Sequence, residues 1–225
     1  MPSVVITGAG RGLGLEFARQ YAADGWSVVA TVRTPAAADE LRRLAGDVRV
    51  ELLDMRDHQA LAGFAGRLGD APLDLLIANA GVSGPDRLVS AEEAGRWLQV
   101  FDVNVVAPTL LAQTLAPKVI AARGKLVAIT SQMGSIADNA SGGWTAYRAS
   151  KAALNAAWRS MAVEMADEPI AIAMLHPGWV KTDMGGAGAM IEIPDSIASL
   201  RRVIAGLEPA DKGVFLNHQG QTLPW

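Results

Sequence analysis

Short apolar runs rich in Val, Ile and Leu recur along the chain, and each is followed by a longer segment with helical spacing. This alternation is typical of a parallel sheet covered by helices on both faces. The runs expected to form strands are Val4–Ile6, Ser27–Val32, Val48–Leu52, Leu73–Ala78, Lys125–Ile129, Ile170–Leu175 and Val214–Leu216. The sequence therefore predicts an α/β fold with a doubly wound, seven-stranded parallel sheet.

Helix start signals stand between several of these runs. Thr34 followed by Pro35 is typical of an N-cap with proline in the first turn, and Ser90 with Glu93 forms a capping box. A further helix is expected to begin at Asp195, with its apolar residues on one face.

Length and composition limit the class of protein. A chain of 225 residues without a Pro/Gly/Ser-rich linker is expected to form a single domain spanning residues 1–225. The formal charge of −3 gives no basic surface for nucleic acid or an anionic membrane. Because the chain has no cysteine, disulfides, thiolate metal ligands and a cysteine nucleophile are excluded.

No targeting or metal-binding pattern is evident. The first residues lack the basic and long apolar parts of a signal peptide, and Asn104 and Pro108 interrupt the longest apolar run, Val103–Ala112. A cytoplasmic protein without a membrane span is expected. The histidines share no ligand spacing, so no metal site is expected; they are His58, His176 and His218.

Four glycines, Gly8, Gly10, Gly12 and Gly14, separate the first strand from a helix that begins near Leu13. Such a loop directs backbone N–H groups and a helix N-terminus at one point, which suits a phosphate. It lacks the Lys-Ser/Thr pair of a P-loop, so a dinucleotide pyrophosphate fits better and the fold is expected to be Rossmann-type. The alternative is a tight turn without a ligand, which the strand-to-helix context disfavours.

The charge pattern bears on the choice of dinucleotide. Enzymes that prefer NAD usually carry Asp or Glu after the second strand to accept from the ribose 2′-OH. Here that strand ends in Arg33, and Arg11 adds a positive charge in the glycine loop. A guanidinium suits the 2′-phosphate, so we predict NADP(H), although either arginine alone could be a solvated surface side chain.

Tyr147 and Lys151 are four residues apart at the start of a long helix that runs toward Ala166, so they project from one face. A nearby ammonium stabilises a phenolate, which suits tyrosine acid–base chemistry. An isolated pair with this spacing is more often a surface pair. Here it follows a strand that ends at Ser131, on the edge of the sheet where ligands bind.

These motifs together resemble the short-chain dehydrogenases/reductases over nearly the whole chain. The matching elements are Thr7–Gly14, Asn79-Ala80-Gly81, Asn104, Ser131, Tyr147 with Lys151, and Pro177-Gly178-Trp179-Val180-Lys181-Thr182. More narrowly, residues 131–136, 138–143 and 223–225 resemble the C-factor-like and sniffer-like carbonyl reductase branch.

The resemblance implies a role for each catalytic residue. Tyr147 would donate a proton to the carbonyl oxygen while NADPH delivers hydride to the carbon, and Ser131 would hydrogen-bond that oxygen. Lys151 would lower the pKa of Tyr147 and hold the nicotinamide ribose, and Asn104 would fix a water that relays protons. Ser135 is the alternative to Ser131, which is preferred because it lies at the strand end.

The resemblance also implies a cofactor site, in which Asp54 and Met55 bind the adenine and Thr182 holds the carboxamide. The residues expected to contact the cofactor are Gly8, Gly10, Arg11, Gly12, Leu13, Gly14, Arg33, Asp54, Met55, Asn79, Ala80, Gly81, Tyr147, Lys151, Pro177, Gly178, Val180 and Thr182. Candidate substrate-pocket walls are Trp144, Trp179 and Met184. The two tryptophans could instead pack in the core, and residues 183–194 form either a short substrate lid or a simple loop.

The expected activity is NADPH-dependent reduction of an aldehyde or ketone, reversible as alcohol oxidation. The alternative is a nucleotide-sensing or signalling protein that acts through partner binding, as the C-factor resemblance allows. Related enzymes pair two helices between subunits, so a homodimer or homotetramer is expected, with Trp158 and the segment Asn104–Ala122 as candidate contacts.

Overall fold

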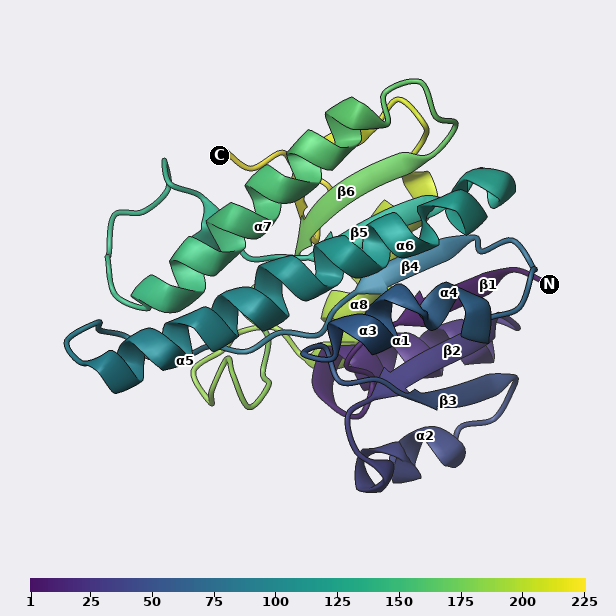
Figure 1. Ribbon diagram of the computed structural model, residues 1–225, viewed down its shortest axis with the longest axis horizontal. Coiled ribbons are helices and arrows are strands. Elements are labelled where there is room, and N and C mark those ends of the chain that lie inside the picture. Colours follow the sequence, from purple (N-terminus) through teal and green to yellow (C-terminus); the bar gives the residue numbers. More distant parts are fainter.

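The computed structural model describes residues 1–225 and contains one sheet of seven parallel strands. The strands are β1 (Ser3–Ile6), β2 (Ser27–Val32), β3 (Val48–Leu52), β4 (Leu75–Ala78), β5 (Lys125–Ile129), β6 (Ala171–His176) and β7 (Lys212–Asn217). Their order is β3-β2-β1-β4-β5-β6-β7, which confirms the doubly wound topology (Figure 1). β4 begins at Leu75 and not at Leu73, because the Leu73 N–H donates to the Lys118 carbonyl outside the sheet.

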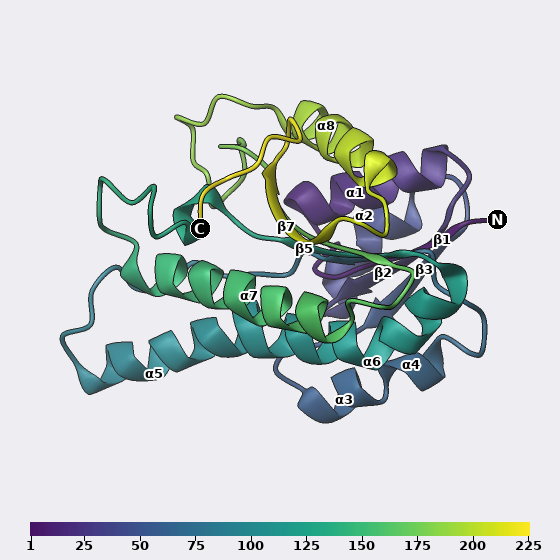
Figure 2. The same cartoon turned by 90° about the horizontal axis from the view of Figure 1, so that it is seen from above.

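Helices cover both faces of the sheet, as Figure 2 shows. One face carries α1 (Gly12–Ala23), α2 (Asp39–Arg42) and α8 (Ile193–Gly206), and the other carries α3 (His58–Ala62), α4 (Phe64–Arg67), α5 (Ala91–Phe101), α6 (Ala107–Ala122) and α7 (Thr145–Glu164). Successive strand side chains point to opposite faces, so Val4 and Ile6 pack with Phe17 of α1, whereas Val5 lies in the core of α6 and α7.

The helix start signals are confirmed in part. The Ser90 hydroxyl accepts from the Glu93 N–H at 3.1 Å and caps α5. Pro35 instead opens a short 3₁₀ helix, η1 (Pro35–Ala38), and α8 begins at Ile193, before Asp195. Proline is favoured in the first turn of a helix, and Pro194 takes that position in α8.

The elements α5, η2 (Asp102–Val106, a π-helical turn) and α6 form one continuous helix over Ala91–Ala122. Asn104 and Pro108 therefore do not break this segment. By length and composition alone this helix could cross a membrane, but the buried core helix of a globular protein meets the same criterion. Leu111 and Leu115 are fully buried against the sheet, which accounts for its apolar character.

Trp158 lies in this same core. Its side chain is fully buried within the protomer, among residues of α6, α7 and β6. The prediction that Trp158 contributes to a subunit contact is therefore wrong, because the indole faces the sheet and not the outer surface of α7.

Candidate active site

A cavity of about 1590 Å³ opens at the carboxyl edge of the sheet, beside the point between β1 and β4 where the strand order reverses. Most of the predicted site residues line it: Gly8, Gly10, Arg11, Gly12, Leu13, Arg33, Asp54, Met55, Asn79, Ala80, Gly81, Ser131, Trp144, Tyr147, Lys151, Pro177, Gly178, Trp179, Val180, Thr182 and Met184. Gly14, Asn104 and Ser135 lie behind the wall of this cavity.

The glycine loop needs glycine for steric reasons. Gly8 and Gly12 have left-handed φ angles of 65° and 56°. A Cβ on Gly8 would stand 2.9 Å from the Ala80 Cα, so the loop lies directly against the end of β4. A Cβ on Gly14 would stand 2.4 Å from the Gly8 carbonyl oxygen. Gly14 therefore allows close packing of α1 under the loop, and its contact with the cofactor stays a prediction.

Asn79 fastens this loop to β4. Its side-chain amide donates to the Thr7 carbonyl at 2.9 Å. In return the buried Thr7 hydroxyl accepts from the N–H groups of Asn79 and Ala80, both at 3.0 Å. Sequence reasoning did not assign Thr7 this role, although its position before the first loop glycine was visible.

Three charged residues predicted to contact the cofactor lie at one side of the cavity. Arg11 pairs with Asp183 at 2.5 Å across the cavity, and both side chains are largely exposed. Arg33 is exposed and has no acidic partner within salt-bridge distance. Asp54 accepts from the guanidinium and the backbone N–H of Arg56, which lowers the pKa of Asp54 to about 2 although partial burial opposes the shift.

Tyr147 and Lys151 meet at the floor of the cavity. The Lys151 ammonium donates to the Ile129 carbonyl at 2.8 Å and lies 5.7 Å from the centre of the Tyr147 ring. Burial lowers the pKa of Lys151 to about 8.

Burial also raises the pKa of Tyr147 to about 12, partly opposed by the Ser131 hydroxyl. The predicted lowering of the Tyr147 pKa by Lys151 is therefore not observed in this structure. Desolvation of the phenolate raises the pKa of Tyr147, and the ammonium of Lys151 is directed at the Ile129 carbonyl. Tyr147 is thus protonated at neutral pH, as a proton donor must be.

Asn104 lies in the π-helical turn η2 with its side chain buried. Its amide oxygen accepts from the Val82 N–H at 2.9 Å, and its amide nitrogen donates to the Val82 carbonyl at 2.8 Å and to the Ser150 hydroxyl at 2.9 Å. Both amide hydrogens are thus used by protein groups. The side chain joins the loop after β4 to helix α7 beside Lys151, and the proton-relaying water remains a prediction.

The two candidate serines have different surroundings. Ser131 lines the cavity, and its hydroxyl oxygen accepts from the Met133 N–H at 3.1 Å, which leaves the hydroxyl hydrogen free. Ser135 lies outside the cavity, where its hydroxyl donates to the Trp225 carbonyl at 3.3 Å and accepts from the Asp138 N–H at 3.0 Å. This geometry favours Ser131 as the residue that contacts a bound carbonyl.

The Pro177–Thr182 segment follows β6 and is held on both sides. The Pro177 carbonyl accepts from Ser196 of α8 at 2.7 Å. Gly178 has a φ of 85°, which strains any other residue, and a Cβ there would stand 2.5 Å from the end of the Ile191 side chain. Thr182 accepts from the Gly185 N–H at 3.0 Å, and this turns the chain into the next loop.

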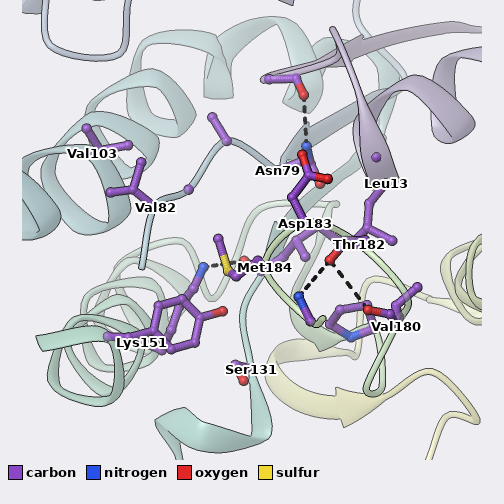
Figure 3. Close-up of a pocket in the computed structure, with 18 of the residues that line it drawn as sticks. Leu13, Asn79, Val82, Val103, Ser131, Lys151, Val180, Thr182, Asp183 and Met184 are labelled. Atoms are coloured by element: carbon purple, nitrogen blue, oxygen red, sulfur yellow. Dashed lines mark hydrogen bonds between the residues drawn. The ribbon is translucent and has the colours of Figure 1, made fainter. Parts of the chain in front are cut away.

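Residues 183–192 form that loop, and Val180 pairs with Ile191 at its base. The predicted segment 183–194 is two residues too long, because Ile193 and Pro194 already belong to α8. Its Met184 lines the cavity (Figure 3).

The two predicted wall tryptophans face this cavity and are not core residues. Trp179 is 53% exposed, and its indole N–H donates to the Gly185 carbonyl at 2.9 Å. Trp144 is 43% exposed on the other side, at the start of α7. The alternative that either packs in the core is therefore wrong.

Sequence reasoning also missed Arg148 and Asp183, which line the cavity. No local motif marks either residue. Arg148 is adjacent to Tyr147, which was the only available signal.

The arrangement of glycine loop, cavity, tyrosine and lysine corresponds to a known family. The family model for short chain dehydrogenases matches residues 2–189. The chain belongs to the short-chain dehydrogenase family. The predicted family and the Rossmann-type fold are both confirmed.

Individual relatives of this short-chain dehydrogenase fall within the predicted branch. The C-signal protein of Myxococcus xanthus is 41% identical over 166 residues, which cover 73% of this chain and 100% of that protein. The structure of the carbonyl reductase Sniffer of D. melanogaster superposes with a TM-score of 0.92 and 32% identity, and covers 100% of both chains. The NADPH-bound carbonyl reductase from chicken fatty liver gives a TM-score of 0.86 and 32% identity, covering 100% of this chain and 99% of that one.

Proposed function

We propose that this short-chain dehydrogenase is an NADP(H)-dependent carbonyl reductase that converts an aldehyde or ketone to an alcohol, and that the reaction is reversible. The observation that carries the proposal is the convergence of Tyr147, Ser131 and Lys151 on one cavity that the glycine loop also lines. The partner is a small carbonyl or alcohol compound.

The residues around the cavity fit this cofactor. The steric need for glycine at Gly8 and Gly12 leaves backbone exposed to a pyrophosphate, and the loop opens helix α1. Arg33 is an exposed cation at the end of β2, where a ribose 2′-phosphate would be bound. Asp54 and Met55 would border the adenine, and Thr182 and Val180 the nicotinamide carboxamide. When bound, NADPH supplies the hydride.

The protein residues supply the rest of the chemistry. Tyr147 donates its phenolic proton to the carbonyl oxygen, which its raised pKa allows because the phenol stays protonated at neutral pH. The free hydroxyl hydrogen of Ser131 stabilises the negative charge that develops on this oxygen. Lys151 is buried beside Tyr147, where its charge stabilises the phenolate that remains.

A second candidate is a nucleotide-sensing or signalling protein that acts through partner binding, which the 41% identity to the C-signal protein allows. Burying an ammonium costs stability, and Lys151 makes one hydrogen bond to protein. Partner binding gives no reason to retain this cost, whereas proton transfer does. We therefore rank catalysis first.

The deciding experiment combines binding and turnover. NADPH and NADH are titrated by tryptophan fluorescence, and NADPH oxidation is then followed with aldehydes and ketones. Tyr147→Phe is compared with Tyr21→Phe, because the chain has two tyrosines and Tyr21 is buried in α1 away from the cavity. We expect Tyr147→Phe to lose at least about a hundredfold in kcat and Tyr21→Phe to retain turnover.

Different outcomes would contradict the proposed reaction and the proposed cofactor. NADPH binding without turnover of any carbonyl, unaffected by Tyr147→Phe, would favour the signalling protein.

For the cofactor, Arg33→Ala is expected to weaken NADPH binding by about tenfold and to leave NADH binding unchanged, since a charge-assisted bond to the 2′-phosphate is lost. Equal affinity for both nucleotides in the unaltered protein would exclude the role of Arg33.

A further inference from the structure

The segment before α7 has an unusual backbone. Gly142, Gly143 and Trp144 are three consecutive residues in the left-handed region, with φ angles of 62°, 67° and 51°. Glycine adopts this conformation freely, but a bulky side chain does so at a cost of about 1–2 kcal/mol. Trp144 and Arg123 are the two non-glycine residues of the chain with positive φ. Strain of this kind persists only where surrounding contacts hold it.

The contacts that hold it come from Arg148. Its Nε donates to the carbonyls of Gly142 and Gly143 at 3.2 and 3.1 Å, and its Nη2 donates to the Ser141 hydroxyl at 2.8 Å. The Arg148 N–H also donates to the Trp144 carbonyl at 2.9 Å, as the first turn of α7 requires. Arg148 therefore contacts each residue of the left-handed segment and the residue before it.

Arg148 does not serve an ion pair. No carboxylate lies within 4.0 Å of its guanidinium, and its donors are directed at neutral oxygens. A guanidinium holds several acceptors in a fixed plane, which a lysine ammonium on a flexible stem does not. The contacts of Arg148 with residues 141–143 therefore require the planar guanidinium of an arginine.

The clamped segment ends at a pocket wall. Trp144 is 43% exposed and lines the cavity three residues before Tyr147 and four before Arg148. An indole held here presents a rigid apolar face to whatever lies against Tyr147.

We propose that Arg148 is a positioning residue that holds Trp144 in its left-handed conformation as the apolar wall for the substrate, and so sets a preference for large, flat, apolar carbonyl compounds. The proposal rests on the proposed carbonyl reductase function. Arg148 acts through Trp144 and leaves the proton transfer by Tyr147 unaffected.

The test compares KM and kcat for 2-naphthaldehyde and propanal at saturating NADPH. We expect Trp144→Ala and Arg148→Ala each to raise KM for 2-naphthaldehyde about tenfold and KM for propanal by less, because apolar contact to the larger ring is lost. The KM of Arg148→Lys for 2-naphthaldehyde is expected to lie between the values for the unaltered protein and for Arg148→Ala. Arg159→Ala is the matched control, since Arg159 is on the same helix and also donates to a backbone carbonyl, that of Lys212, outside the cavity.

Two further variants test the mechanism. Gly143→Ala keeps Arg148, and no atom lies within 4 Å of the added Cβ, so any effect comes from the cost of the left-handed backbone. Gly143→Ala is expected to raise KM for 2-naphthaldehyde by as much as Arg148→Ala does. In the double variant with Trp144→Ala, Arg148→Ala is expected to add nothing to KM.

Several outcomes would overturn the proposal. These are an additive double variant, a fall in kcat on propanal with Arg148→Ala, and an unchanged KM for 2-naphthaldehyde. Hydrogen exchange keeps this test separate from the proposed function. Residues 141–145 are expected to exchange faster in Arg148→Ala than in Arg159→Ala, with residues 7–14 unchanged, whether or not a carbonyl is reduced. Equal exchange rates of residues 141–145 in the two variants would also contradict the proposed role of Arg148.

Discussion

Individual hydrogen bonds separate residues that have the same chemistry. Ser131 and Ser135 are both buried hydroxyls near the end of β5. Ser135 uses its hydrogen on the Trp225 carbonyl, whereas Ser131 keeps its hydrogen available at the cavity. The difference lies in the partners that tertiary packing provides, and not in the side chain.

We therefore expect opposite effects from two alanine substitutions. Ser131→Ala should lower kcat by about a hundredfold, because a donor to the developing oxyanion is lost. Ser135→Ala should leave kcat within about twofold and lower the free energy of unfolding by about 1 kcal/mol, because two hydrogen bonds of a buried group are lost. Steady-state kinetics and urea unfolding measure both. The reverse pattern of kcat would move the catalytic role to Ser135.

Lys151 links function to a cost in stability. Its folded-state pKa is lowered by burial from 10.5 to about 8, so the folded protein disfavours the charged form. Between these two pH values the unfolded chain binds a proton that the folded chain lacks. This lysine therefore makes the free energy of unfolding rise with pH over that interval, and its charge is destabilising below about pH 8.

Lys151→Met should accordingly abolish turnover yet stabilise the protein at pH 7, by about 2 kcal/mol. The difference in Tm from the unaltered protein should shrink as the pH is raised from 7 toward 10, because the unaltered lysine then becomes neutral on folding. Circular dichroism melting curves at several pH values measure this. Lys181→Met, at an exposed position, is the control. A lower Tm for Lys151→Met at pH 7 would contradict the argument.

At the scale of elements, one ion pair connects the two loops that face each other across the cavity. Arg11 belongs to the glycine loop and Asp183 to the loop after Thr182. The pair is exposed, so it contributes little to stability. A phosphate bound at the glycine loop would compete with Asp183 for the same guanidinium.

Asp183→Asn should therefore tighten NADPH binding by about twofold to fivefold at low ionic strength, with a smaller gain at about 0.5 M salt. Fluorescence titration at two salt concentrations measures this. Asp138→Asn removes the same charge at the cavity margin, where Asp138 accepts from Gln132 and has no arginine partner. An equal gain in this control would indicate a general charge effect and not release of Arg11.

At the scale of the whole molecule, the long helix and α7 lie on one face of the sheet and carry apolar side chains that are exposed to solvent. Leu98 of α5 is 73% exposed, Val106 of η2 is 47% exposed and Val163 of α7 is 60% exposed. Both views show α5, α6 and α7 side by side on this face of the molecule (Figures 1 and 2). Apolar faces of this kind mark interfaces between chains.

We expect a homodimer or homotetramer of the 23.6 kDa chain in solution, measured by size exclusion with light scattering. The double variant Leu98→Glu with Val106→Glu should shift the mass toward the monomer, because charges at these positions would be buried without partners. Glu substitutions of Leu88 and Val89, which are exposed outside the helices, serve as the control. A monomeric unaltered protein at tens of micromolar would contradict the expectation.

Features that depend on short stretches of chain were predictable from the sequence. The short apolar runs between helical segments predicted the positions of all seven strands, because a strand buried on both faces of a sheet consists of consecutive apolar residues. The glycine loop was recognisable because a left-handed turn against Ala80 excludes a side chain. Tyr147 and Lys151 were recognisable because four residues bring them to one face of a helix.

Features that depend on residues far apart in the chain were decided by the tertiary structure. Arg11 and Asp183 are separated by 172 positions, and no local pattern pairs them. Asn104 was predicted from its motif, but its bonds to Val82 and Ser150 follow from the packing of the π-helical turn between two other elements. The pKa values of Tyr147 and Lys151 are set by burial, which a sequence does not quantify, and burial reversed the expected direction for the tyrosine. The sequence thus determined the fold and the chemical groups of the site, whereas packing decided which groups meet and which protonation state each one holds.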